Sequence, residues 1–261
     1  MYRYNPQREE SKMIRDIEAM RTLYKFCLAE AESSTIYANG GAEVVFVLPV
    51  EALQRVLQRK GVEDLFCDLV MEGFIQTEVS DDLHKDMIYH LQKCDTILLT
   101  LHRQGVVYDR VGSFLTYSMV KREKQKPIMY FGGIMVYPDL QDNGYGSALM
   151  RYAMKREVFS YVALRTQNPQ MYASFAKVCE ETFPNGTPPT SEVEKAGKVI
   201  ATMLHMQHYQ PKRMVEKGTY GASLYKRTVE PRGIALHAFK HLNIKRGDSL
   251  IAVGERRYLW Q

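Results

Sequence analysis

The sequence lacks long apolar runs and is poor in cysteine. No apolar run approaches the ~20 residues of a membrane-spanning helix, and the N-terminal stretch MYRYNPQREESK has no apolar core of the secretory type. The 261 residues include only four cysteines, with no CxxC pair and no pairing with histidine. We therefore expect a cytoplasmic protein without a membrane partner or a metal, whose thiols are free and buried: Cys27, Cys67, Cys94 and Cys179.

A strong charge of one sign is also missing. The net charge of +5 does not demand nucleic acid, although it suits an anionic ligand. The one dense charge run, Lys121–Pro127 (KREKQKP), is more typical of a solvated hairpin loop than of a nucleic-acid site. No internal repeat and no linker rich in Gly, Ser or Pro divides the chain. We therefore expect one large domain with additions and no nucleic-acid partner.

Helical patterns dominate the first third of the chain. An apolar face at three- and four-residue spacing (Met13, Ile17, Met20, Tyr24 and Cys27) predicts a helix over residues 9–32. A polar break at Ser33–Gly41 and a strand at Glu43–Leu48 (EVVFVL) follow. Further helices are predicted at 51–60, 62–74 and 81–94.

Strand patterns dominate from residue 95 onward. They predict strands at 96–102, at 106–120 with an interruption near Gly112, at 128–137 and at 161–165. Helices are expected after Gly146 and after Pro169, and an amphipathic helix at 193–205. The segments 210–221 and 249–254 are candidates for closing strands.

The stretch from Tyr130 to Ser147 (YFGGIMVYPDLQDNGYGS) carries the strongest functional signal. An apolar strand reaches Pro138, and a short polar loop then leads through Gly144 and Gly146 into a helical pattern. The free N–H groups and the dipole of a helix N-terminus favour an anion such as a phosphate. Glycines permit positive φ and close approach of the backbone. No Lys follows Gly146 and position 149 is Leu, so neither a P-loop nor a complete GxGxxG fingerprint is present.

The motif Gln141-x-x-Gly144-x-Gly146, with Ile134 and Val136 alternating upstream, resembles the pyrophosphate-binding motif of the GNAT superfamily of acyl-CoA-dependent N-acetyltransferases. The alternative is an ordinary strand–turn–helix corner. Downstream, the run from Arg165 to Pro169 (RTQNP) resembles the second GNAT motif, in which an Asn separates a strand from a helix that packs against the cofactor. The resemblance covers residues 128–178.

This resemblance implies a mixed α+β (α/β) fold with a central twisted mixed sheet flanked by helices. Residues 1–42 would be an N-terminal helical extension, residues 43–261 the acetyltransferase domain, and the helix at 193–205 an insertion. Acetyl-CoA would be the acyl donor. The implied cofactor contacts are Ile134, Met135, Val136, Gln141, Asp142, Asn143, Gly144, Tyr145, Gly146, Ser147 and Asn168. Gly132-Gly133 is compatible with a bulge in the central strand.

Proton transfer is less clearly encoded. Many GNAT enzymes have a Tyr seven residues after the Asn, whose phenol protonates the leaving thiolate; here that position is Phe175. Tyr172 lies one turn earlier and is the candidate general acid, and the alternative is that its ring packs in the core. Candidate general bases are Asp109, Glu216, His205 and His208.

Two functions from different classes remain open. The first is an N-acetyltransferase acting on a primary amine of a small molecule or a protein. A variant of this hypothesis is the transfer of a longer acyl chain, which a Met-rich lining that includes Met135 would accommodate. The second is a non-catalytic GNAT-like domain that binds acyl-CoA as a sensor or scaffold. A homodimer is the default expectation for the oligomeric state.

Overall fold

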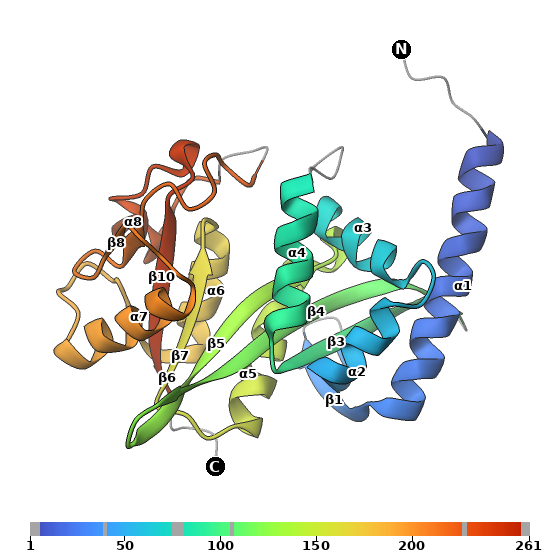
Figure 1. Ribbon diagram of the computed structural model, residues 1–261, viewed down its shortest axis with the longest axis horizontal. Coiled ribbons are helices and arrows are strands. Elements are labelled where there is room, and N and C mark those ends of the chain that lie inside the picture. Colours follow the sequence, from blue (N-terminus) through green and yellow to red (C-terminus); the bar gives the residue numbers. More distant parts are fainter. Residues whose placement is uncertain (1–5, 39–40, 75–80, 105–106, 226–228, 257–261) are drawn as a thin grey trace. The chain divides into compact units, whose positions relative to one another are not determined.

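The computed structural model describes the chain except residues 1–5, 39–40, 75–80, 105–106, 226–228 and 257–261 (Figure 1). Its strands form a mostly antiparallel sheet in the order β1-β2-β3-β4-β5-β6-β10-β9-β8, with β7 also paired to β10. One pair, β5–β6, is parallel. The predicted mixed α+β fold with a central mixed sheet is therefore confirmed. Among the described residues, no helix combines the length and apolar character that crossing a membrane requires.

Contacts along the chain divide it into two compact units. The first comprises Met1–Gly73, Thr77–Thr116 and Gly133–Tyr145, and the second comprises Phe74–Gln76, Tyr117–Gly132 and Gly146–Gln261. The chain crosses between them twice near residue 75, once within β4, once within β5 and once more between Tyr145 and Gly146. The predicted boundary between residues 42 and 43 stays a prediction.

The first unit contains the predicted helices and strands at close to the expected positions, together with a strand at 32–38 and a 3₁₀ turn at 138–140 that were not predicted. They are α1 (Pro6–Glu30), β1 (Glu32–Ala38), β2 (Gly41–Pro49), α2 (Val50–Leu57), α3 (Val62–Phe74), α4 (Asp81–Lys93), β3 (Thr96–Gln104), the first part of β4 (Val107–Arg122), the end of β5 (Gln125–Val136) and the 3₁₀ turn η1 (Pro138–Leu140).

The polar break predicted at Ser33–Gly41 is wrong, because this segment contains β1. β1 pairs antiparallel with β2 along its whole length, from Glu32 opposite Val47 to Ala38 opposite Gly41. Alternation is weak in β1, since only Ile36 is buried. The prediction took Asn39-Gly40 as the end of a polar break, although this dipeptide is also typical of two-residue hairpins between strands.

The apolar face predicted for α1 is only partly correct. Met20 and Cys27 are fully buried, whereas Ile17 is 41% exposed. The buried stripe also includes Ala19 and Leu23, which the prediction omitted. Periodicity predicts which side of a helix is apolar, but not where along the helix packing begins. Met13 lies outside the residues whose side chains are described.

The interruption predicted near Gly112 is also wrong, since β4 runs from Val107 to Arg122. A Cβ on Gly112 would lie 3.1 Å from Thr100 Oγ1 and 3.3 Å from the backbone N of His102. The glycine therefore allows close packing within a continuous strand rather than breaking it.

The charged hairpin between β4 and β5 is confirmed and is tighter than predicted. Only Glu123 and Lys124 form the turn, and Lys124 has a φ of 54°. Both side chains are exposed, as expected for a solvated charge run.

The second unit is built around β6 and β10. Its elements are the remainders of β4 and β5, α5 (Tyr145–Arg156), β6 (Tyr161–Thr166), α6 (Pro169–Val178), β7 (Cys179–Phe183), α7 (Ser191–Met203), β8 (Tyr209–Gln210), β9 (Val215–Glu216), α8 (Ala235–Phe239), η2 (Ile244–Arg246) and β10 (Ser249–Arg256). β10 lies antiparallel to β6 and pairs on its other side with β7 and β9.

The inserted helix α7 covers one part of this sheet. Its apolar face packs against inward residues of β5, β6 and β10. Val193, Ala196 and Ile200 are fully buried, as the periodicity predicted. The insertion is therefore part of the core of the second unit.

The strand predicted at 210–221 is mostly absent, and β7 was not predicted. Only the two-residue strands β8 and β9 form in that region. Gly218 and Gly221 adopt φ values of 68° and 67°, which are incompatible with an extended strand.

The cysteines are free thiols, as predicted. Cys27, Cys94 and Cys179 are buried, whereas Cys67 is half-buried, which corrects the expectation for that residue. Burial raises the pKa of Cys27 to about 12, so this thiol stays protonated at neutral pH.

Candidate functional site

β5 leaves its parallel partner before it ends. The ladder with β6 covers Ile128–Phe131 opposite Tyr161–Leu164, whereas β5 continues through Gly132 to Val136. From Gly132 to Val136, the backbone N–H and C=O groups on the side of β5 that faces β6 are therefore not paired with β6. Backbone N–H and C=O groups need partners, so this edge can accept a ligand with amide groups.

The bulge expected at Gly132-Gly133 stays a prediction. β5 is continuous across both glycines, and neither has a positive φ. A Cβ on Gly133 would meet Thr116 Oγ1 at 3.6 Å, an ordinary contact. A side chain at position 133 would therefore fit on that side of β5, so packing there does not require a glycine.

The loop after β5 is held by its own hydrogen bonds. The N–H of Leu140 donates to the carbonyl of Tyr137 at 2.9 Å, and the N–H of Gln141 donates to that of Pro138 at 3.1 Å. The Gln141 side chain reaches back, and its Nε2 donates to the carbonyl of Val136 at 3.1 Å. Gln141 therefore braces the loop, as we expected from its place in the motif.

Two left-handed residues turn the chain into α5. Asp142 has a φ of 61° and Gly144 a φ of 81°. The prediction of positive φ is confirmed for Gly144 and wrong for Gly146, which lies in the first helical turn.

The N-terminus of α5 has the electrostatic character of an anion site. Its first turn contains no acidic residue, and its last turn contains Lys155 and Arg156. The first four N–H groups of a helix have no acceptor within it. With no carboxylate in the first turn to offset the dipole, these amides of Tyr145 to Ala148 favour a negative ligand.

Within the first unit, contacts with residues far away in the sequence hold the loop at both of its ends. Tyr145 is 4% exposed, and its hydroxyl donates to Glu43 Oε1 at 2.8 Å across 102 residues of sequence. Burial first, and the Glu43 contact second, raise the pKa of Tyr145 to about 12. The Arg110 guanidinium lies 4.0 Å from the ring centroid of Tyr137 and pairs with Asp139 at 3.4 Å. The loop is thus preorganised by Glu43 and Arg110, which no local motif had indicated.

The side chain of Met135 is directed at a helix. A Cβ on Gly73 of α3 would clash with Met135 Cε, so this thioether fills the space beside Gly73. This packing favours core filling over the lining of an acyl-chain pocket. Ile134, Met135 and Val136 are all half-buried on β5, and their role as cofactor contacts stays a prediction.

Asn168 has a clear local role in the second unit. It is the N-cap of α6, and its Oδ1 accepts from the N–H groups of Gln170 at 2.8 Å and Met171 at 3.4 Å. Its predicted contact with a cofactor stays a prediction, as do those of the exposed Asp142 and the half-buried Asn143 and Ser147.

The candidate acid Tyr172 lies in the core. It is fully buried, its ring packs edge-on against Phe239, and its hydroxyl donates to the carbonyl of Pro184. Burial strongly raises its pKa. Phe175 is also fully buried, against Phe131. This geometry favours the packing alternative, and the catalytic role of Tyr172 stays a prediction.

Tyr172→Phe is therefore expected to affect stability more than turnover. Losing the hydrogen bond to Pro184 should lower the free energy of unfolding by about 1–2 kcal/mol. Denaturant unfolding and the initial rate of CoA release would measure the two effects. A large loss of turnover with unchanged stability would reinstate Tyr172 as the acid.

The candidate bases are divided between the units. In the first, Asp109 Oδ1 lies 2.9 Å from His102 Nδ1. In the second, Glu216 is 5% exposed and accepts from the N–H of His208 at 2.8 Å, whereas the side chains of His205 and His208 are exposed. None of these contacts identifies a base. In the described part of the chain, no three His, Cys, Asp or Glu side chains are grouped as metal ligands.

Asp142→Gly is expected to stabilise the protein and to strengthen anion binding. A non-glycine residue at a φ of 61° costs roughly 1 kcal/mol, and glycine removes that cost. The substitution also removes a negative charge from the loop. Thermal unfolding and calorimetric titration with CoA would measure both effects, and weaker binding would contradict the assignment of the loop to a phosphate ligand.

Comparison with known proteins found similarity only to solved structures. No family model matches the sequence, and no curated protein matches it. An IAA acetyltransferase from Bacillus cereus is 14% identical, with 81% of this chain and 97% of that chain covered and a TM-score of 0.41. The ribosomal-protein-S18-alanine N-acetyltransferase from Escherichia coli is 10% identical, with 81% and 93% covered and a TM-score of 0.43.

An aminoglycoside 6'-acetyltransferase type Ii is 13% identical, with 49% of this chain and 83% of that chain covered and a TM-score of 0.34. A likeness of this size concerns the path of the chain and carries no argument about substrate or chemistry. All three are acetyltransferases by name.

Proposed function

We propose that this protein transfers an acetyl group from acetyl-CoA to a primary amine. One observation carries the proposal: the end of β5 lies beyond its ladder and leads through the left-handed Asp142 and Gly144 into α5. The first turn of α5 has no acidic residue. An extended edge followed by a helix N-terminus suits a ligand with an amide-containing arm and a diphosphate.

Each part of this segment has a role in the proposal. Backbone N–H groups from Asp142 to Gly146, with Ser147, hold the diphosphate. Ile134–Val136 offer backbone groups to the amides of the pantetheine arm. The reaction then needs an oriented amine and stabilisation of the thioester oxygen, and N–H groups at a strand edge can supply the second.

The reaction forms one bond and breaks another. The amine nitrogen attacks the thioester carbonyl carbon, the C–N bond forms, and the C–S bond breaks with release of the thiol of CoA. The amine must lose a proton. Water can accept that proton, so the absence of an identified base does not exclude the reaction.

A second candidate is a non-catalytic domain that binds acyl-CoA. The observation in its favour is the engagement of Tyr172 with Pro184, together with the burial of Phe175 in the core. Neither residue at the positions expected for the acid is then available to a ligand. The same loop would bind CoA under both proposals.

Calorimetry and a turnover assay would separate the candidates. Acetyl-CoA and CoA are titrated into the purified protein, and thiol release is then followed with amino acids, polyamines, aminoglycosides and peptides as acceptors. Binding with amine-dependent thiol release supports the enzyme. Binding without release from any amine supports the second candidate, and no binding would contradict both.

The acceptor and the oligomeric state belong to the proposal as well. The amine is carried by a small molecule or a protein, and the protein is a homodimer by default. A series of acyl-CoA donors of increasing length would test the preference for acetyl. We expect the acetyl donor to be preferred, because the Met135 side chain fills space beside Gly73 instead of lining a pocket.

A further inference from the structure

β1 is the strand at one edge of the sheet, and it belongs to the first unit. β2 pairs with it on one side, from Glu32 opposite Val47 to Ala38 opposite Gly41, without a shift in register. Within the part of the chain that the structure describes, no second strand pairs with β1. The other side of β1 therefore presents a row of backbone N–H and C=O groups that a further strand can pair with.

The register of the hairpin shows which residues present these groups. Only residues 39–40 separate Ala38 from Gly41, and the pair that flanks a two-residue loop exchanges both of its hydrogen bonds. Hydrogen-bonded and non-hydrogen-bonded pairs alternate along an antiparallel ladder, so every second residue of β1 is bonded to β2. The backbone groups that point away from β2 are those of the residues between them: Ser33, Thr35 and Tyr37.

Exposed apolar side chains adjoin this open edge. Tyr37 is 74% exposed, and Val44 of β2 is 43% exposed. Thr35 lies opposite Val44 and two residues from Tyr37, so these three side chains point to the same face of the hairpin. Ile36 points to the other face and is buried. The exposed face is therefore a surface that an added strand and its side chains can cover.

The edge lacks the features that usually prevent such pairing. Edge strands are commonly protected by lysine, by proline or by a bulge. Residues 32–38 (ESSTIYA) contain no lysine and no proline, and their only charged residue is the first, Glu32. β1 can therefore pair along its whole length.

We propose that β1 pairs antiparallel with β1 of a second copy of this chain, which makes the protein a two-fold symmetric homodimer. The register that pairs all seven residues places Thr35 opposite Thr35 of the second copy, on the two-fold axis. Ser33 then lies opposite Tyr37 of the second copy. Each pair of outward-pointing residues exchanges two hydrogen bonds, so this register forms about six of them.

The edge is complementary to itself, which favours a second copy over an unrelated strand. In this register Glu32 lies opposite Ala38, so no charged side chain faces another. Two threonines facing each other across the axis form a favourable cross-strand pair. Each Tyr37 ring lies over the short side chains of Ser33 and Thr35 of the second copy, and both copies lose exposed apolar surface.

The interface is separate from the residues of the candidate cofactor site. The hairpin does approach that site through Glu43 of β2, which lies opposite Ile36 and accepts from the Tyr145 hydroxyl at 2.8 Å. No residue of β1 belongs to the segment from Ile134 to Ser147, however. The dimer therefore does not depend on the proposed function, and it can be measured without CoA.

Analytical ultracentrifugation over a concentration series tests the interface, with Thr35→Lys and Thr202→Lys as matched variants. Thr202 is an exposed residue of α7, in the second unit. We expect the unaltered protein and Thr202→Lys to sediment as dimers. Two lysines facing each other across the axis repel, so the dissociation constant should rise by at least about 10-fold in Thr35→Lys. A monomeric unaltered protein, or equal dimerisation of the two variants, would overturn the proposal.

Cross-linking tests the register and does not depend on how well the lysine variant folds. The Cα atoms of a hydrogen-bonded antiparallel pair lie about 5.5 Å apart. A short bis-maleimide should therefore join Thr35→Cys into a covalent dimer. Thr202→Cys and the unaltered protein, whose cysteines are buried or half-buried, should stay unlinked. Failure of Thr35→Cys to form a covalent dimer would contradict the pairing of β1 with itself, whatever the CoA titrations show.

Discussion

Replacing Gly144 by glutamate is expected to weaken CoA binding by at least about 100-fold. Two effects act in the same direction. A side chain at a φ of 81° strains the loop by roughly 1–2 kcal/mol. The new carboxylate also lies beside the proposed phosphates, and like charges ~4 Å apart near a protein surface repel by about 4 kcal/mol before screening by salt. Calorimetric titration with CoA at low and moderate ionic strength would measure the loss.

Two further variants separate strain from charge. Gly144→Ala introduces the strain alone and should lower stability by about 1 kcal/mol, with a smaller loss of affinity. Gly233→Glu places the same carboxylate at another positive-φ glycine, where a Cβ meets nothing within 4 Å, and should leave CoA binding intact. Unchanged affinity in Gly144→Glu would remove the loop from the binding site.

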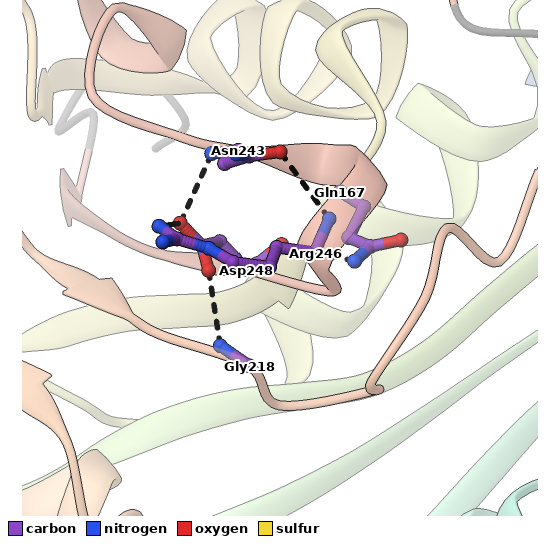
Figure 2. Close-up of polar contacts among 5 residues, drawn as sticks. All are labelled: Gln167, Gly218, Asn243, Arg246 and Asp248. Carbon is purple, nitrogen blue, oxygen red and sulfur yellow. Dashed lines mark hydrogen bonds and ion pairs between the residues drawn. The ribbon is translucent and has the colours of Figure 1, made fainter.

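Replacing Asp248 by alanine is expected to have the largest effect on stability. The change leaves the N–H groups of Gly218 and Asn243, whose hydrogen bonds to Asp248 are part-buried, without their acceptor (Figure 2). Hydrogen bonds to a charged group contribute about 1.5–3 kcal/mol each, so the free energy of unfolding should fall by roughly 3–5 kcal/mol. Chemical denaturation followed by circular dichroism would measure this change.

The control for that experiment is a carboxylate in an exposed ion pair. The Asp139 side chain is 69% exposed and pairs with Arg110 at 3.4 Å. Asp139→Ala should therefore change stability by no more than about 1 kcal/mol. If the two variants were equally stable, Asp248 would not hold the segment around Gly218 to the start of β10.

The strand–loop–helix segment could be predicted because its signals are local. Apolar alternation, Pro138 and the glycines lie within a few residues of one another, and each restricts the backbone where it stands. The contacts that hold this segment could not be predicted in the same way. Tyr145 meets Glu43 from 102 residues away, and no local pattern pairs those two side chains.

The same distinction explains the tyrosines. The sequence correctly placed Tyr172 on the helix that follows Asn168. Tertiary packing decides which side of that helix is covered, and for this reason the full burial of Tyr172 could not be predicted. Tyr225 contacts Asn168, 57 residues earlier in the sequence, and Gln167 beside it contacts Asp248 across 81 residues. Periodicity has nothing to detect in residues 217–225, since these residues form no helix or strand.

The position of β10 has a consequence for how the chain folds during synthesis. This strand is formed by Ser249–Arg256, yet it lies between β6 and β9 inside the sheet. A nascent chain on the ribosome therefore cannot close the second unit until β10, the last of the described strands in the sequence, has emerged. Until then the free side of β6 is an unpaired strand edge, which is prone to association with other chains. We expect efficient production of the protein to depend on chaperones that shield that edge during translation.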